Sequence, residues 1–118
     1  MIISKNVITT FASPYVNSDS VICFAKSQTL AGASDKVILI KDHSKLHMLF
    51  LNFTLSKVIQ HVEVSLDEIS DVNISNNPFS LDLVWSFRRG ENKWRFRMMK
   101  KIMTLGNMQK EFIDRLVI

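Results

Sequence analysis

The chain has 118 residues, 47% of them apolar, which is typical of a single folded domain with a real core. Its formal net charge is +4, and its one cysteine excludes an intramolecular disulfide and a zinc site built from several cysteines. No run approaches the roughly 18 continuous apolar residues of a membrane-spanning helix, and the N-terminal sequence lacks the pattern of a signal peptide. We therefore expect one cytoplasmic domain over residues 1–118.

The first part of the chain predicts a short helix and then strands. Residues 5–12 fit a helix within an N-terminal extension (1–18). This helix should end by Ser13, because the residue before Pro14 is pushed away from helical geometry. Strand signals dominate the region 19–100, which contains several short runs rich in β-branched and aromatic residues.

Two of these strands are apolar on both faces. Segments 36–41 and 46–53 fit a hairpin around a turn at 42–45, and neither alternates strictly between apolar and polar residues. Such strands are covered on both sides, either by another element of the fold or by a second subunit. Cys23 lies in the apolar run 21–25, which predicts a buried and unreactive thiol.

The middle of the chain predicts two strands separated by one helical turn. Residues 58–66 alternate as a half-buried strand. In the turn that follows, Ser65 and Glu68 match a capping box. The next strand should point Val72 and Ile74 inward.

The clearest unit is a hairpin over residues 79–100. A two-residue turn at Gly90-Glu91, with glycine first, suits a type II′ turn and pairs Phe87 with Trp94. A slip of one residue would turn every side chain to the opposite face. This register places inward Phe79, Leu81, Leu83, Trp85, Phe87, Trp94, Phe96 and Met98. It places outward Asp82, Ser86, Arg88, Lys93, Arg95 and Arg97.

The last segment predicts an amphipathic helix over residues 105–117. Leu105, Met108, Phe112 and Leu116 recur at helical spacing on its apolar side. Gln109 and the neighbouring charged residues are expected to face water. The predicted fold class is mainly β (α+β): a strongly bent antiparallel sheet of about seven strands, with its open end capped by the C-terminal helix.

Several phrases resemble the bacterial pleckstrin-homology (PH)-like domains: SVICFAKSQ before a small-residue loop, KVILIKDHSKLHMLFL, VEVSLDEISDVNIS and QKEFIDRLVI. The resemblance covers roughly residues 20–118. It implies a seven-stranded bent sheet capped by a C-terminal helix, a role in binding or assembly, and homo-oligomers in some members. Eukaryotic relatives hold phosphoinositides between basic residues of the first two hairpins, where this chain offers Lys26, Lys36, Lys41 and Lys45 without a dense cluster.

The candidate site is a basic segment, residues 88–101. It carries seven Lys and Arg against Glu91, a net charge of +6, so the rest of the chain is −2. Such a patch favours nucleic acid or an acidic lipid surface as partner. In the predicted register the aromatic rings face inward, which favours core aromatics beside a solvated basic face over stacking on bases. The candidate anion-binding residues are Arg88, Lys93, Arg95, Arg97, Lys100 and Lys101.

No pattern indicates a catalytic residue, a cofactor or a metal site. His43 and His47 are four residues apart, a spacing that suits a metal pair on a helix, but this segment reads as turn and strand. The carboxylates of Asp67, Glu68 and Asp71 are interpreted as a solvated turn. We therefore expect a non-catalytic binding module of PH-like fold that self-associates or binds a protein partner. The alternative is an anionic-ligand binder acting through the basic segment.

Overall fold

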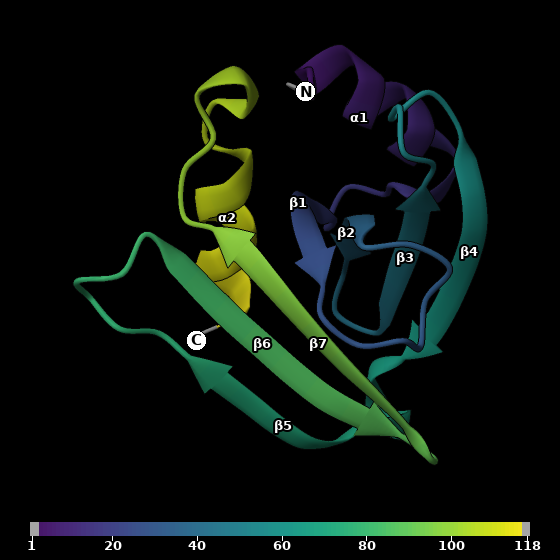
Figure 1. Ribbon diagram of the computed structural model, residues 1–118, viewed down its shortest axis with the longest axis vertical. Helices are drawn as coiled ribbons and strands as arrows, with labels where there is room; N and C mark the ends of the chain where they lie inside the picture. The colour runs from purple at the N-terminus through teal and green to yellow at the C-terminus, as the bar shows by residue number, and fades with distance from the viewer. Residues whose placement is uncertain (1–2, 117–118) are drawn as a thin grey trace.

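The computed structural model describes residues 3–116 (Figure 1). Its helices and strands, in chain order, are α1 (Lys5–Ala12), β1 (Val21–Ser27), β2 (Lys36–Lys41), β3 (Lys45–Leu51), β4 (Val58–Ser65), β5 (Ser70–Ser75), β6 (Asp82–Arg89), β7 (Asn92–Met99) and α2 (Met108–Leu116). The predicted N-terminal helix is confirmed with its predicted bounds, and the Ser4 hydroxyl caps it by accepting a hydrogen bond from the Val7 N–H at 3.2 Å. The predicted reason for its end is wrong, because Ser13 keeps helical dihedral angles before Pro14 and a 3-10 turn continues over Ser13–Tyr15.

All seven strands form one antiparallel sheet in the order β4-β3-β2-β1-β7-β6-β5. In Figure 1 strands β5–β7 run diagonally, at a steep angle to the upright β1–β4, so the sheet turns back on itself where β1 meets β7. Helix α2 packs against β1 at one end of the enclosed space. The predicted class, a mainly β fold with a seven-stranded antiparallel sheet and a C-terminal helix, is confirmed. Among residues 3–116 no helix has the length and apolarity needed to cross a membrane.

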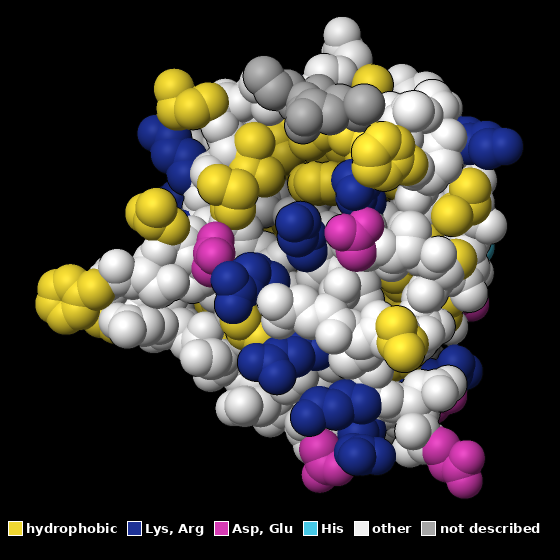
Figure 2. All heavy atoms as spheres, in the orientation of Figure 1, with side chains coloured by type: hydrophobic (Ala, Val, Ile, Leu, Met, Phe, Trp, Pro, Cys, Tyr) yellow, Lys and Arg dark blue, Asp and Glu magenta, His cyan; other side chains and the backbone are white. Residues whose placement is uncertain are grey.

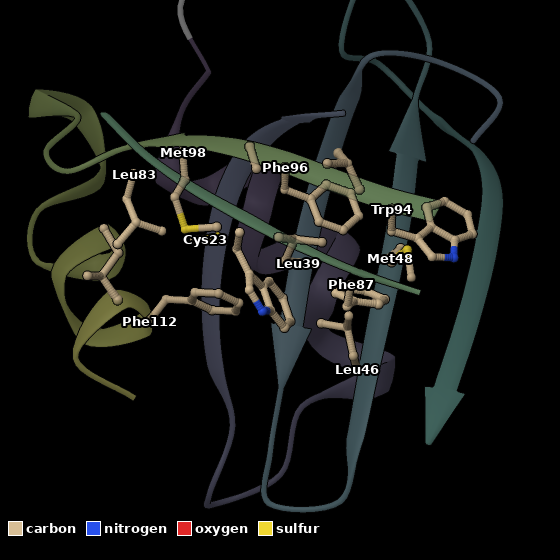
Figure 3. Packing of buried hydrophobic residues seen from close by; sticks show 14 of the residues in the cluster. Cys23, Leu39, Leu46, Met48, Leu83, Phe87, Trp94, Phe96, Met98 and Phe112 are labelled. Atoms are coloured by element: carbon tan, nitrogen blue, oxygen red, sulfur yellow. The ribbon is translucent and has the colours of Figure 1, made fainter. Parts of the chain in front are cut away.

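The inner face of the sheet holds the main core, with rings from β6 and β7 lying against aliphatic side chains from β1–β3 (Figure 3). The predicted hairpin register is confirmed: Phe87 lies opposite Trp94, and Trp85 lies opposite Phe96. All four side chains are buried. Gly90 has φ +60°, as the first position of a type II′ turn requires.

The outer face of β2 and β3 forms a second core. Ile38 and Ile40 from β2 and Leu49 from β3 are fully buried there, packed against Ile8 and Ala12 of α1. An element of the same chain therefore covers the second apolar face of these strands. This packing accounts for their lack of strict alternation without a second subunit.

Three of the residues predicted to point inward do not. The Asn77 side chain accepts a hydrogen bond from the Phe79 N–H, and this local turn delays the start of β6 to Asp82. Phe79 and Leu81 are consequently 95% and 81% exposed. In β5 the pairing shifts between residues 70 and 73, so Val72 leaves the inward register and is 53% exposed, whereas Ile74 packs on the core.

The last helix and the mid-chain turn also differ from the sequence-based prediction. Gly106, with φ +60°, separates a 3-10 turn at Met103–Leu105 from α2, so the helix begins at Met108 rather than at residue 105. The predicted last helical residue, 117, lies outside the described part of the chain. The turn at Leu66–Glu68 is present, but Ser65 makes no side-chain cap, so the capping box is wrong.

Candidate anion-binding face and adjoining hollow

The outward side of β7 carries a row of cations. Lys93, Arg95 and Arg97 alternate with the buried Trp94, Phe96 and Met98 because successive side chains of a strand point to opposite faces. Alternate residues on one face of a strand are about 6.8 Å apart. Figure 2 shows the resulting line of Lys and Arg side chains running towards the hairpin tip.

The neighbouring strands widen this row into what we call the basic face. Antiparallel pairing places Arg88 of β6 beside Lys93, and Lys26 of β1 beside Arg97. Ser86 lies opposite Arg95 and supplies no opposing charge. The basic face is defined as Lys26, Arg88, Lys93, Arg95 and Arg97.

Only part of this positive charge is balanced locally. Arg88 lies 3.8 Å from the Asp71 carboxylate, and Arg97 lies 3.5 Å from that of Asp82. Within residues 3–116, no carboxylate lies within 4.0 Å of Lys26, Lys93 or Arg95. Exposed ion pairs are worth at most about 1 kcal/mol, so the two paired arginines also remain able to exchange their partners for an incoming anion.

Two of the predicted site residues do not join the row. Lys100 and Lys101 follow the end of β7, where the chain leaves the sheet. The Lys100 ammonium donates a 2.8 Å hydrogen bond to the Asn77 carbonyl, which fastens the loop before β6. Lys101 is exposed beyond the strand. The prediction that these two lysines share a site with the arginines therefore receives no support from their positions.

A hollow of about 620 Å³ adjoins the end of the basic face at which Lys26 and Arg97 lie. Figure 2 shows its hydrophobic floor, with charged side chains at the lower rim. Of the residues between 3 and 116, the charged ones that line it are Lys26, Asp82 and Arg97. The apolar lining is Ile3, Phe24, Ala25, Leu81, Met99 and Ile102.

The hollow exists because β1 and β7 separate. Their ladder contains only the pairs Lys26–Arg97 and Ser27–Phe96, and beyond Lys26 the strands no longer bond each other. The Gln109 side chain bridges the separated strands instead. Its carbonyl accepts from the Phe24 N–H at 2.7 Å, and its amide donates to the Phe24 and Met99 carbonyls, each at 2.9 Å.

This role corrects the prediction that Gln109 faces water, since its side chain is fully buried. The physical reason is that backbone groups in a protein interior need hydrogen-bond partners. On the helical wheel Gln109 lies between Leu116 and Ile113, within the apolar side, and only the course of the two strands shows which groups it must satisfy.

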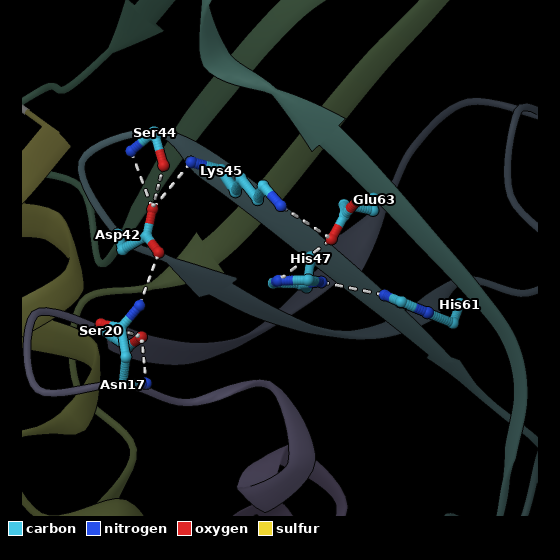
Figure 4. Close-up of polar contacts among 8 residues, drawn as sticks. All are labelled: Asn17, Ser20, Asp42, Ser44, Lys45, His47, His61 and Glu63. Carbon is cyan, nitrogen blue, oxygen red and sulfur yellow. Dashed lines mark hydrogen bonds and ion pairs between the residues drawn. The ribbon is translucent and has the colours of Figure 1, made fainter.

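The histidines form a different arrangement from the one their spacing suggests. His47 on β3 and His61 on β4 approach to 3.0 Å between Nδ1 and Nε2 (Figure 4). His43 lies apart from them in an exposed turn. Tyr15 packs on both rings, and the Glu63 carboxylate lies 3.8 Å from His47 Nε2. Burial, followed by the nearby His61, lowers the pKa of His47 below its usual 6.5. Glu63 approaches the nitrogen of His47 that faces away from His61, so the three groups do not converge on one point.

The remaining predicted groups lie in structural positions. Cys23 is fully buried, and burial raises the pKa of its thiol, so the predicted buried cysteine is confirmed. Glu68 lies 3.4 Å from Arg89, which places it with Asp71 among carboxylates that neutralise neighbouring arginines. Comparisons of the chain with protein families, with curated proteins and with solved structures found no match.

Proposed function

We propose that this protein is a non-catalytic binding module that holds an anionic ligand on its basic face. The observation that carries the proposal is the geometry of β7. Buried apolar side chains anchor every second residue of the strand, so the intervening cations are held in a fixed row. Five cations face two carboxylates on this surface, and the excess favours anions over neutral or cationic ligands.

The same geometry favours recognition of charge rather than of base sequence. Stacking on bases needs exposed aromatic rings beside the cations, and here Trp94 and Phe96 point into the core. A regularly spaced row of cations suits a ligand with repeated negative charges. Binding of this kind weakens steeply as salt rises, because each contact releases counterions.

The non-catalytic part of the proposal is supported by how the charged groups are used. The ionisable side chains that line the hollow are Lys26, Asp82 and Arg97, and the last two lie 3.5 Å apart as an ion pair. A catalytic pair of acid and base instead needs groups whose environments separate their pKa values and aim them at one reacting atom.

Self-association and a cytoplasmic location stay predictions. The apolar outer faces of β2 and β3 motivated self-association, and α1 now accounts for them. Size-exclusion chromatography with light scattering tests this directly: a dimer at micromolar concentration would restore the self-associating module as the leading proposal. Membership of the PH-like family also stays a prediction, which the strand order and the position of α2 support.

The anion-binding role is tested with a fluorescein-labelled single-stranded oligothymidylate as a polyanion probe. The variant Lys93→Gln with Arg95→Gln removes two cations that have no carboxylate partner among the described residues. Its matched control, Lys5→Gln with Lys57→Gln, removes two exposed cations outside the basic face. Both variants lower the net charge equally, so they differ only in the place of the loss.

Fluorescence anisotropy should show roughly tenfold weaker binding for the first variant and a near-parental affinity for the control. The slope of log K against log salt should become shallower by about 1.4, since each contact with a single strand contributes about 0.7. Equal losses of affinity in both variants would mean that binding depends on the net charge of the protein and not on the basic face. Unchanged binding in Lys93→Gln with Arg95→Gln would remove the basic face as the site.

A further inference from the structure

The hollow beside the basic face has the size and lining of a small-molecule site. Its volume of about 620 Å³ lies within the roughly 300–1,000 Å³ of typical ligand pockets. Phe24 and Ala25 of β1 and Met99 of β7 supply apolar surface, and Ile3 and Ile102 add to it. Such a lining favours a hydrocarbon group over a polar one.

The charges of the hollow lie together on the side where it meets the basic face. Lys26 and Arg97 are direct cross-strand partners. Asp82 pairs with Arg97 at 3.5 Å, and no carboxylate of residues 3–116 lies within 4.0 Å of Lys26. A guanidinium and an ammonium side by side form a receptor for a carboxylate or a phosphate.

We propose that the hollow binds the aliphatic chain of a single-chain amphiphilic anion, whose acidic head lies between Lys26 and Arg97. The inference rests on the proposed anion-binding role, and it adds a ligand class with a single acidic head at the end of the basic face where Lys26 and Arg97 meet the hollow. Charge complementarity at one end and apolar lining at the other give the ligand a single orientation.

The shape of the site favours a free amphiphile over a membrane surface. The chain must enter a recess of the protein, whereas a membrane-binding surface inserts protruding side chains into the bilayer. Met99, at the wall of the hollow, is half exposed and flexible, so it can close over an entering chain. Each added methylene should therefore tighten binding about two- to fourfold until the hollow is full.

The experiment is calorimetric titration of the full chain with decanoate, hexanoate, decanol and decyltrimethylammonium, the ionic compounds below their micelle concentrations and decanol below its solubility limit. Decanoate should bind at least tenfold more tightly than each of the other three, because only decanoate has both a long chain and an anionic head. Vesicles of acidic phosphatidylglycerol form a separate arm. Binding to these vesicles without binding to monomeric decanoate would overturn the inference in favour of a membrane surface.

Two pairs of variants locate the site. Met99→Ser should weaken decanoate binding at least fivefold, whereas Met103→Ser, at an 84% exposed methionine outside the hollow, should not. Lys26→Gln should also weaken decanoate binding at least fivefold. Lys93→Gln, on the basic face but outside the hollow, should leave the affinity for decanoate within twofold of the parent. Equal effects within either pair would place the ligand elsewhere and overturn the inference.

The two proposals fail in distinguishable ways. If oligothymidylate binds through Lys93 and Arg95 but decanoate does not bind, the amphiphile inference is wrong and the anion-binding face stands. If neither probe binds, both are wrong. Amide chemical shifts of residues 24–26 and 99 give a readout that does not depend on heat, and they should move with decanoate but not with hexanoate.

Discussion

Replacing Gln109 by leucine removes three hydrogen bonds at the place where β1 and β7 separate. The change keeps the approximate size of the side chain but leaves the Phe24 N–H and the Phe24 and Met99 carbonyls without their partner. A buried backbone group without a partner costs about 1–3 kcal/mol, so three partly buried groups cost about 4–5 kcal/mol. Burying leucine in place of glutamine offsets about 2 kcal/mol of this loss.

The expected net loss is about 2–3 kcal/mol, a large share of the roughly 5–15 kcal/mol by which domains are stable. The loss of stability is measured by urea unfolding, monitored through the fluorescence of the two buried tryptophans. With a slope of about 1.5 kcal/mol per molar urea, the midpoint should fall by about 1.3–2 M. A midpoint within about 0.5 M of the parent would mean that water satisfies these groups and that the bridge is not needed.

A second substitution at the same position gives a control with a pH signature. The carboxylate of Gln109→Glu would face the Phe24 and Met99 carbonyls, so burial and repulsion would raise its pKa above the unfolded value of about 4.3. A raised folded pKa means that stability is present at low pH and is lost as pH rises through that pKa. The loss of stability of Gln109→Glu relative to the parent should therefore be smaller at about pH 4 than at about pH 7. Glu111→Gln, at an exposed residue of the same helix, should change stability by less than about 0.5 kcal/mol at either pH.

Four other changes test packing and electrostatics elsewhere in the fold. Gly32→Ala would place a Cβ against the fully buried Phe50 ring, and the crowding should lower the unfolding free energy by about 1–3 kcal/mol in urea titrations. Ile8→Ala, on the inner side of α1, should cost about 2–4 kcal/mol by the same assay if α1 is part of the core, and less than about 1 kcal/mol if it is not. The N–H groups of Ser44 and Lys45 hold the pKa of Asp42 well below its usual 3.8. Because the pKa of Asp42 is lower in the folded chain, the stability of the fold should fall as pH drops below 3.8. In Asp42→Ala the thermal unfolding midpoint should therefore depend less on pH between about pH 4 and about pH 2. The lowered pKa of His47 means that the unfolded chain binds its proton more tightly. Stability should therefore decline from about pH 7.5 to about pH 5.5, and His47→Gln should remove part of that slope; an identical slope in the variant would contradict the reasoning.

The late hairpin was predictable because its rules are local. Strict alternation of apolar and polar residues and a glycine suited to positive φ together determine one register, and β6 and β7 adopt it residue for residue from Leu83 to Met98. The same alternation failed at Phe79 and Leu81. There the Asn77 side chain accepts the Phe79 N–H in a local turn, so the strand pattern begins only at Asp82.

The candidate site was predictable only in part, because it is assembled across the chain. The sequence by itself determined the row on β7, since alternation alone sends Lys93, Arg95 and Arg97 to one side. Lys26 joins that row through the pairing of β1 with β7, which is a contact between residues 71 positions apart along the chain (26 and 97). No local pattern encodes such a pairing.

Composition, periodicity and turn residues by themselves determined the class of fold, the inward aromatic rings and the outward cations, because each depends on neighbours within a few residues. Contacts between distant segments are needed to explain why α1 covers the outer face of β2 and β3, why β1 and β7 separate into a hollow, and why Gln109 bridges them. Those features arise where distant segments meet. There the need to bury apolar surface and to satisfy backbone hydrogen bonds is met by whichever side chain the folded chain brings within reach.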